Sequence, residues 1–220
     1  MAPVPSSASS GLREEGRERP VVREYRQLAP YYDRRWARYV RETSDLTREA
    51  LGDRAGGGRL LDVGCGTGTF LGRLAAEASS AVLHGTDLSP DMLRVARRRL
   101  PPGVRLARAG AEALPYRDGA FDTVTSVSVL HFVDTPGDAL REAYRVLRPG
   151  GTVVVTDWCR DYAAMKLLDV WLRWREPGHG ATRSTGEVVA MMEEAGFRNI
   201  LPQRRRVAGW WGILAVRGVR

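Results

Sequence analysis

Three glycines and one aspartate have the types and spacing of a ligand site at the end of a strand. The stretch LLDVGCGTGT, residues 60–69, places Gly64, Gly66 and Gly68 directly after a short apolar run. Glycine lets the backbone pass close to a ligand, because it has no side chain that would collide with it. Asp87 ends the next apolar run, where a carboxylate can accept both hydroxyls of a ribose. The pattern predicts a site for a ribose-bearing ligand.

The order of the glycines argues against a nicotinamide dinucleotide as that ligand. The pyrophosphate-binding fingerprint G-x-G-x-x-G requires a glycine at position 69, where this chain has Thr69. An NAD-dependent oxidoreductase is therefore a weak alternative. Taken alone, the glycine run is also compatible with a tight strand-to-helix turn that binds nothing.

Strands and helices alternate around these residues. Apolar runs predict strands at 59–63, 81–87, 104–109, 121–130 and 152–158, and helical patterns lie between them at 70–78, 89–100 and 137–147. Such alternation is typical of a parallel, doubly wound α/β sheet, which binds ligands at the carboxyl ends of its strands. A capping box at 184–187 begins a further helix, and two runs flanking Ala208 and Gly209 predict a C-terminal hairpin.

The flanking segments complete a single domain. Residues 1–20 are rich in Ser, Pro, Arg and Glu and are expected to form a disordered leader. The domain then spans 21–220, with N-terminal helices at 21–55, broken near Pro30, and a substrate-cap insertion at 158–183. That insertion carries an amphipathic helix at 161–174. The stripe formed by Met165, Trp171 and Trp174 is expected to pack in the core, and the wall of a pocket is the alternative.

Composition excludes several classes of protein. With 43% hydrophobic and 27% charged residues, two cysteines and no membrane-length apolar run, the chain is expected to be a cytoplasmic, soluble protein without a structural metal. The net charge of +8 is concentrated in the arginine-rich C-terminus. The run QRRRVAG, residues 203–209, lacks the interleaved aromatic residues of a nucleic-acid surface, so nucleic acid is not the expected partner.

Two further motifs make the pattern specific: AGAEALPYRDGAFD at 109–122 and LRPGG at 147–151. With the glycine turn and Asp87, they resemble the class I S-adenosylmethionine-dependent methyltransferases, in particular the large family that includes the ubiquinone and menaquinone methyltransferases. The resemblance covers about residues 22–219. It implies a Rossmann-like seven-stranded sheet with a C-terminal antiparallel hairpin and a helical N-terminal lid.

The resemblance also implies the chemistry. S-adenosylmethionine would donate a methyl group by in-line displacement to a small-molecule acceptor, leaving S-adenosylhomocysteine and requiring no metal. A catalytically silent cofactor-binding or interaction protein of the same fold is the alternative. The tryptophans of the insertion favour an acceptor that is apolar or contains a ring.

Residue by residue, the resemblance assigns the cofactor site. Its methionine part would be held by Asp62, Gly64, Cys65, Gly66 and Gly68, its ribose by Asp87, and its adenine by Leu88, Met92, Ala111 and Glu112, with Ser126 under the sulfonium and Tyr25 and Tyr32 in the lid. The family often reads G-D-A-E where this chain reads Ala109-Gly110-Ala111-Glu112, so an aspartate contact to adenine is replaced here. The two tyrosines would alternatively serve only to pack the lid against the core.

Three side chains are candidates for the acceptor side. His131 follows the fourth strand and is expected to act as a general base, to touch the acceptor, or to be structural. Trp158 and His179 lie in the insertion and are expected to contact the acceptor. His84 lies inside a strand and is expected to be structural.

Overall fold

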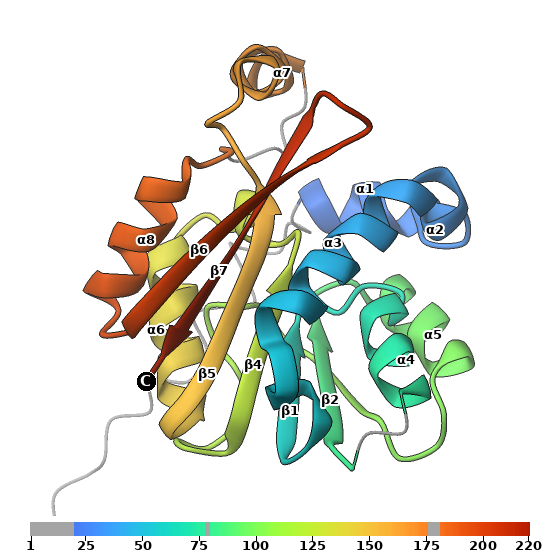
Figure 1. The fold of residues 1–220 in the computed structure, drawn as a ribbon. Coiled ribbons are helices and arrows are strands. Elements are labelled where there is room, and N and C mark those ends of the chain that lie inside the picture. Colours follow the sequence, from blue (N-terminus) through green and yellow to red (C-terminus); the bar gives the residue numbers. More distant parts are fainter. Residues whose placement is uncertain (1–19, 78–79, 176–180) are drawn as a thin grey trace, which may run out of the picture.

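The computed structural model describes residues 20–77, 80–175 and 181–220. One seven-stranded sheet runs through these residues in the order β3-β2-β1-β4-β5-β7-β6 (Figure 1). The strands are β1 (Arg59–Val63), β2 (Val82–Asp87), β3 (Arg105–Arg108), β4 (Phe121–Val127), β5 (Leu147–Trp158), β6 (Arg198–Val207) and β7 (Trp211–Val219). β1 to β5 pair in parallel, and β7 is antiparallel to both of its neighbours. The expected Rossmann-like sheet with a C-terminal antiparallel hairpin is confirmed.

The strand order reverses beside β1, and this reversal fixes where a ligand can bind. From β1 the chain moves outward to β2 and β3, then returns to add β4 on the other side of β1. The connections after β1 and after β4 therefore leave the sheet in opposite directions and open a crevice at the carboxyl ends of these strands. Both motifs that the sequence singled out, the glycine turn and Asp87, lie at that edge.

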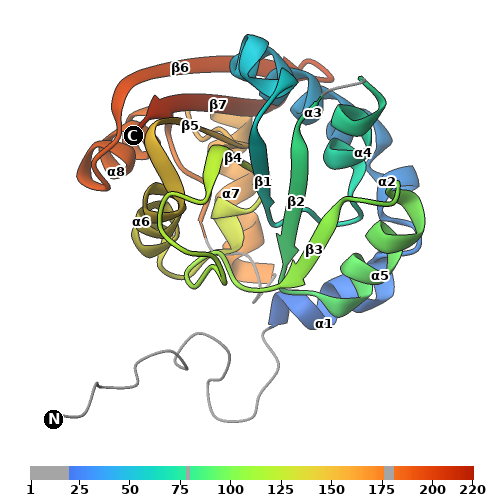
Figure 2. The ribbon, with the colours of Figure 1, turned by 90° about the horizontal axis from the view of Figure 1, so that it is seen from below.

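Helices cover both faces of the sheet (Figure 2). Leucines of α3 (Ala37–Leu51), α4 (Thr69–Ala76) and α5 (Pro90–Arg99) join one buried apolar cluster, and residues of α6 (Pro136–Val146) and α8 (Thr185–Glu194) join another. Ser89 begins α5 by accepting the amide of Met92, and Ser184 with Glu187 forms a complete capping box at α8. These contacts hold the helices whose ends border the crevice.

The N-terminal region contains one helix more than expected. α1 (Pro20–Leu28) and α2 (Tyr32–Arg35) are separated near Pro30 as the sequence predicts, and a second break at Trp36 precedes α3. Residues 1–19, which make up nearly all of the expected leader, lie outside the described residues, and Pro20 begins α1. Among the described helices, none has the length and apolar character to cross a membrane.

Two expectations near the C-terminal half are wrong. β5 begins at Leu147 instead of residue 152, because the glycine-rich turn continues the strand: Leu147 pairs with Phe121, and the register shifts before Thr152 pairs with Thr123. In α7 (Ala163–Arg175), Met165 is fully buried, but Trp171 and Trp174 are 48% and 84% exposed. These two tryptophans are therefore not part of the core.

Candidate functional site

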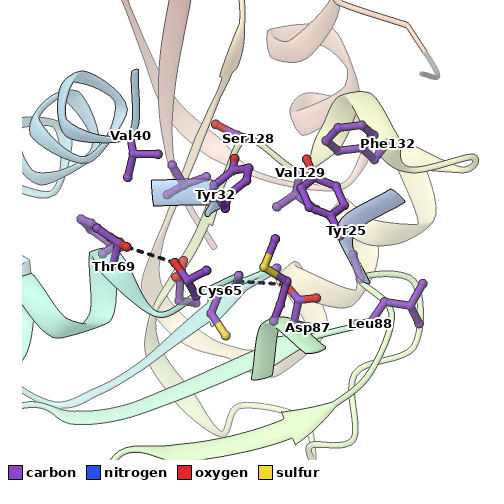
Figure 3. Close-up of a pocket in the computed structure, with 18 of the residues that line it drawn as sticks. Tyr25, Tyr32, Val40, Cys65, Thr69, Asp87, Leu88, Ser128, Val129 and Phe132 are labelled. Atoms are coloured by element: carbon purple, nitrogen blue, oxygen red, sulfur yellow. Dashed lines mark hydrogen bonds between the residues drawn. The ribbon is translucent and has the colours of Figure 1, made fainter. Parts of the chain in front are cut away.

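A cavity lies in the crevice at the carboxyl ends of β1, β2 and β4, under the N-terminal helices (Figure 3). Its wall is built from the glycine turn, the ends of β1, β2 and β4, the segment after β3, the N-terminal helices α1–α3, residues of α4 and α5, and η2 (Leu130–Phe132). It contains eleven of the thirteen predicted cofactor-site residues, namely Tyr25, Tyr32, Asp62, Gly64, Cys65, Gly66, Asp87, Leu88, Met92, Ala111 and Glu112.

At the glycine turn, backbone atoms without side chains line the cavity. Gly64 has φ +69°, and a Cβ there would come within 2.3 Å of Val129, so only glycine fits. Gly66 has φ +54°, but a Cβ there would meet no protein atom within 4 Å. Gly66 therefore leaves space in the cavity wall that a ligand can use. Gly68, also predicted for the site, stands at the N-cap of α4 and is not among the lining residues.

Asp87 is held rigidly at the end of β2. One of its carboxylate oxygens accepts the amide of Gly66 and the other accepts the amide of Ser89, both at 2.8 Å. Burial raises the pKa of Asp87, while these amides oppose that shift. Each oxygen keeps acceptor capacity for a second donor, as binding of two ribose hydroxyls would require.

In the segment after β3, the Glu112 carboxylate lies beside position 110, where this chain has glycine instead of the family's aspartate. A Cβ on Gly110 would lie 3.0 Å from Oε2 of Glu112. The Glu112 carboxylate thus occupies the space next to Gly110 where the family's aspartate side chain would begin. Leu88, which follows β2, and Met92 of α5 also line the cavity. The adenine end of the predicted site is therefore bounded by two apolar side chains and one carboxylate.

Asp62 lies in β1 directly below the glycine turn. It is buried, and its carboxylate accepts the hydroxyl of Thr125 at 2.7 Å. Burial raises the pKa of Asp62 to about 7, since the charged form loses its hydration. A cationic group placed beside Asp62 would lower that pKa again, which suits the ammonium of a bound amino acid.

Aromatic side chains from the N-terminal helices cover the middle of the cavity. The rings of Tyr25 and Tyr32 lie 5.6 Å apart, and the Tyr25 ring contacts Phe132 edge-on at the same distance. Burial raises the pKa of Tyr32 to about 12, so its hydroxyl stays protonated at neutral pH. Such a cluster of aromatic faces attracts a cation such as a sulfonium.

Asp33 ties the N-terminal helices to the glycine turn, a contact that the sequence did not reveal. Its carboxylate accepts the hydroxyls of Thr67 at 2.8 Å and Thr69 at 2.9 Å. The guanidinium of Arg99 forms an ion pair with the same carboxylate and also donates to Thr67. We call Asp33, Thr67, Thr69 and Arg99 the lid latch. Because Tyr32 is the preceding residue, the latch fixes an aromatic wall of the cavity.

Tyr39, Ser128 and Trp158 form a hydrogen-bonded chain at the other end of the cavity. The indole N–H of Trp158 donates to the Tyr39 hydroxyl at 2.6 Å, and that hydroxyl lies 2.6 Å from Oγ of Ser128. Ser128 has φ +61°, an uncommon conformation for a residue other than glycine, and its side chain lines the cavity. Ser126, the predicted residue, lies two positions earlier inside β4 and does not line the cavity.

The acceptor-side candidates lie differently from the prediction. His131 is 2% exposed, its Nδ1 contacts the Asp157 carboxylate, and its ring stacks on Trp158 behind Phe132. His131 and Trp158 thus support the cavity wall and are not among the lining residues. His179 lies outside the described residues. His84 is buried in β2 between Tyr116 and Phe121, and burial lowers its pKa to about 4.

Several residues that line the cavity do not belong to any of the sequence motifs. Val40, Thr43 and Ser44 reach the cavity from α3. In the sequence, Tyr39 and Val40 belong to an apolar helical spacing, which indicates that one face of the helix is buried but not what that face contacts. No group of three or more His, Cys, Asp or Glu side chains within the described residues is arranged to hold a metal ion.

Comparisons with known proteins find similarity to methyltransferases. Residues 61–155 match the family model described as a methyltransferase domain. The chain is 32% identical to the ubiquinone/menaquinone biosynthesis C-methyltransferase of Azotobacter vinelandii over 179 residues, 72% of this chain and 67% of that protein. It is 31% identical to a tRNA (carboxymethyluridine(34)-5-O)-methyltransferase of Arabidopsis thaliana over 172 residues, 76% of this chain and 40% of that protein. Across the first curated relatives, the chain spans 36% to 67% of their length.

A solved structure shares the fold over nearly the whole chain. It is a Thermotoga maritima S-adenosylmethionine-dependent methyltransferase, described as a possible histamine N-methyltransferase. The TM-score is 0.73 at 24% identity, and the match covers 92% of this chain and 99% of that one.

Proposed function

Because the chain belongs to the class I S-adenosylmethionine-dependent methyltransferase family, we propose that it methylates an apolar, ring-containing small molecule. The observation that carries the proposal is the cavity itself. It has a rigid carboxylate, Asp87, at the end of β2, and its lining also includes the aromatic and apolar side chains of Tyr39, Val40 and Phe132. Cavities with this lining suit apolar ligands that carry a few polar groups.

The residues present fit the cofactor. Asp87 would accept the ribose hydroxyls, Glu112, Leu88 and Met92 would enclose the adenine, and Asp62 with Gly64–Gly66 would hold the methionine part. The open space at Gly66, where a Cβ meets nothing within 4 Å, leaves room for such close backbone contact. When bound, S-adenosylmethionine supplies a methyl group on a sulfonium, which an acceptor lone pair takes as the carbon–sulfur bond breaks.

The protein's contribution is to align the acceptor and exclude water. Tyr25, Tyr32 and Phe132 would shield the reacting centre, and the lid latch would keep these rings in place. At the acceptor end, the Tyr39 hydroxyl accepts the indole N–H of Trp158 and shares a hydrogen bond with Ser128, in which either hydroxyl can donate. When Tyr39 donates to it, the Ser128 hydroxyl would donate a hydrogen bond to an oxygen or nitrogen of the acceptor.

The protonation of this wall argues against a tyrosine base. Burial raises the pKa of Tyr39 well above its ordinary value, as it does for Tyr32, so both hydroxyls act as donors near neutral pH. His131 is engaged with Asp157 behind the wall. We therefore propose that the acceptor reacts through a lone pair that is already available, such as that of an ionised ring hydroxyl or an electron-rich ring.

Transfer of a labelled methyl group tests the proposal. The purified protein is incubated with methyl-labelled S-adenosylmethionine and, separately, catechol, hydroquinone, a solvent extract of cellular lipids and quinones, or bulk tRNA. We expect label in a ring-containing product. Label in tRNA would contradict a small-molecule acceptor, and binding of the cofactor without transfer to any fraction would favour the catalytically silent alternative.

A further inference from the structure

The outward face of α7 carries a continuous apolar stripe. Leu167, Val170, Trp171 and Trp174 are 76%, 70%, 48% and 84% exposed. Residues three and four positions apart in a helix lie on one face, so these four side chains form a single row, the α7 stripe. Soluble proteins seldom expose a row of large apolar side chains unless it meets a partner or a membrane.

The stripe points outward because the opposite face of α7 is anchored. Met165 is fully buried and Asp169 is 2% exposed. The amide of Thr182 donates to the Asp169 carboxylate at 2.7 Å, which ties the helix to the segment that returns to α8. Rotating α7 to hide the stripe would expose Met165 and break this buried hydrogen bond.

The sequence of α7 and of the C-terminal hairpin contains more basic than acidic residues. Asp169 is the only acidic residue in the sequence of α7, and it is turned inward, whereas Lys166 is exposed. From Arg198 to Arg220, the chain contains six arginines and no acidic residue. Arg204, Arg205 and Arg206 follow one another on β6, the edge strand of the sheet. Arg204 pairs with Asp161 and Arg205 with Glu49, and the Arg204 side chain remains 55% exposed. The whole chain carries a net charge of +8.

A second apolar group projects from the same end of the sheet. Trp158, at the end of β5, pairs with Ile213 of the antiparallel β7. The turn that joins β6 to β7 therefore extends past the end of β5, from which the chain continues into α7. Trp210 in this turn is 50% exposed. Figure 1 shows α7 and the turn at one end of the sheet, the end that also holds the cavity.

We infer that this end of the protein binds the surface of an anionic lipid bilayer, with the α7 stripe in the interface. An amphipathic helix lies in the plane of a membrane when its apolar face enters the acyl boundary and cations meet the headgroups. Tryptophan favours that interface. With 13 residues, α7 is shorter than the roughly 20 residues needed to span a bilayer, so it lies on the membrane.

The positive net charge of the chain favours an anionic bilayer, rather than a second copy of the chain, as the partner of the α7 stripe. Two molecules of charge +8 repel each other, whereas anionic headgroups attract one such molecule. Membrane binding does not require the proposed acceptor to be correct, because it depends only on the surface of α7 and the hairpin.

Co-sedimentation with vesicles tests this inference. The full chain is mixed with vesicles of phosphatidylcholine alone or of phosphatidylcholine with phosphatidylglycerol, at low and high salt. We expect binding to the anionic vesicles that weakens as salt rises. Trp174→Glu should lower that binding by about tenfold or more, because a charge replaces the most exposed side chain of the stripe. The matched control is Val82→Glu, which changes a side chain that is 43% exposed at the opposite end of the sheet.

Each outcome decides the inference. Thermal melting and S-adenosylhomocysteine binding establish that both variants are folded. Absence of wild-type binding to anionic vesicles would overturn the inference, and so would equal binding by wild type and Trp174→Glu. Self-association in sedimentation velocity that Trp174→Glu abolishes, without vesicle binding, would assign the stripe to a contact between copies instead.

Discussion

The hydroxyl of Tyr39 lies 2.6 Å from Oγ of Ser128, although the two residues are 89 positions apart in the chain. Tyr39 comes from α3 and Ser128 from the turn after β4, so their contact joins the N-terminal helices to the sheet at the cavity. Because Trp158 donates to the same hydroxyl, the three side chains form one connected chain of hydrogen bonds.

Tyr39→Phe should lower the free energy of unfolding by about 1–3 kcal/mol, because the part-buried indole N–H of Trp158 and hydroxyl of Ser128 lose their hydrogen bonds to Tyr39. Urea denaturation measures the change. The control is Tyr31→Phe, at a tyrosine that is 63% exposed, which should change stability by less than about 0.5 kcal/mol. A double-mutant cycle with Ser128→Ala should give a coupling energy on the order of 1 kcal/mol, and additive effects would refute the contact.

Asp87→Ala should weaken S-adenosylhomocysteine binding by about 1–3 kcal/mol, since hydrogen bonds to a charged group are lost. Calorimetry measures the affinity. Asp138→Ala serves as the matched control, because Asp138 is an exposed acid at the start of α6, where it pairs only with its own helix and Thr135. Equal affinities of wild type and Asp87→Ala would remove Asp87 from the site.

Asp33→Ala should make S-adenosylhomocysteine dissociate faster, by about tenfold, because the lid latch loses its shared acceptor. Stopped-flow displacement measures the dissociation rate. Asp53→Ala, at an exposed acid in the turn after α3, is the control and should leave that rate unchanged. An unchanged rate in Asp33→Ala would mean that the N-terminal helices do not retain the cofactor.

Affinity for S-adenosylhomocysteine should rise with pH through the pKa of Asp62, which burial places at about 7. Below this pH the folded, ligand-free protein holds Asp62 protonated, and above it the carboxylate is charged. The cationic ammonium of the ligand favours the charged form, so binding tightens from about pH 6 to about pH 8. Asp62→Asn should flatten this dependence in calorimetric titrations. A profile that stays the same in Asp62→Asn would show that another group controls it.

Much of the cavity follows from sequence because its parts are local. The glycine turn needs left-handed backbone at Gly64 and Gly66, and the next strand must end at a carboxylate, so both motifs can be read along the chain. Their meeting at one sheet edge follows from parallel topology. Leu88, Ala111 and Glu112 are instead assigned through the resemblance to the family, and the segments that follow β2 and β3 bring them to the same cavity.

What escaped prediction depends on contacts between distant segments. Asp33 meets Thr67 and Arg99 across 34 and 66 positions, and no local pattern encodes that pairing. Ser128 replaces Ser126 in the cavity because the chain turns at φ +61° just after β4, which ends the alternation of a strand. The spacing of the apolar residues in α7 predicts a buried face. Periodicity alone does not show which apolar side chain is buried, and in the structure Met165 is buried whereas Trp174 is exposed.

The most direct test of the account is a pair of calorimetric titrations of the full chain, one with S-adenosylhomocysteine and one with NAD. The glycine turn with Thr69, the carboxylate of Asp87 and the aromatic lid predict that S-adenosylhomocysteine binds, that Asp87→Ala weakens this binding, and that NAD produces no binding heat. Binding of NAD without binding of S-adenosylhomocysteine would contradict the central claim.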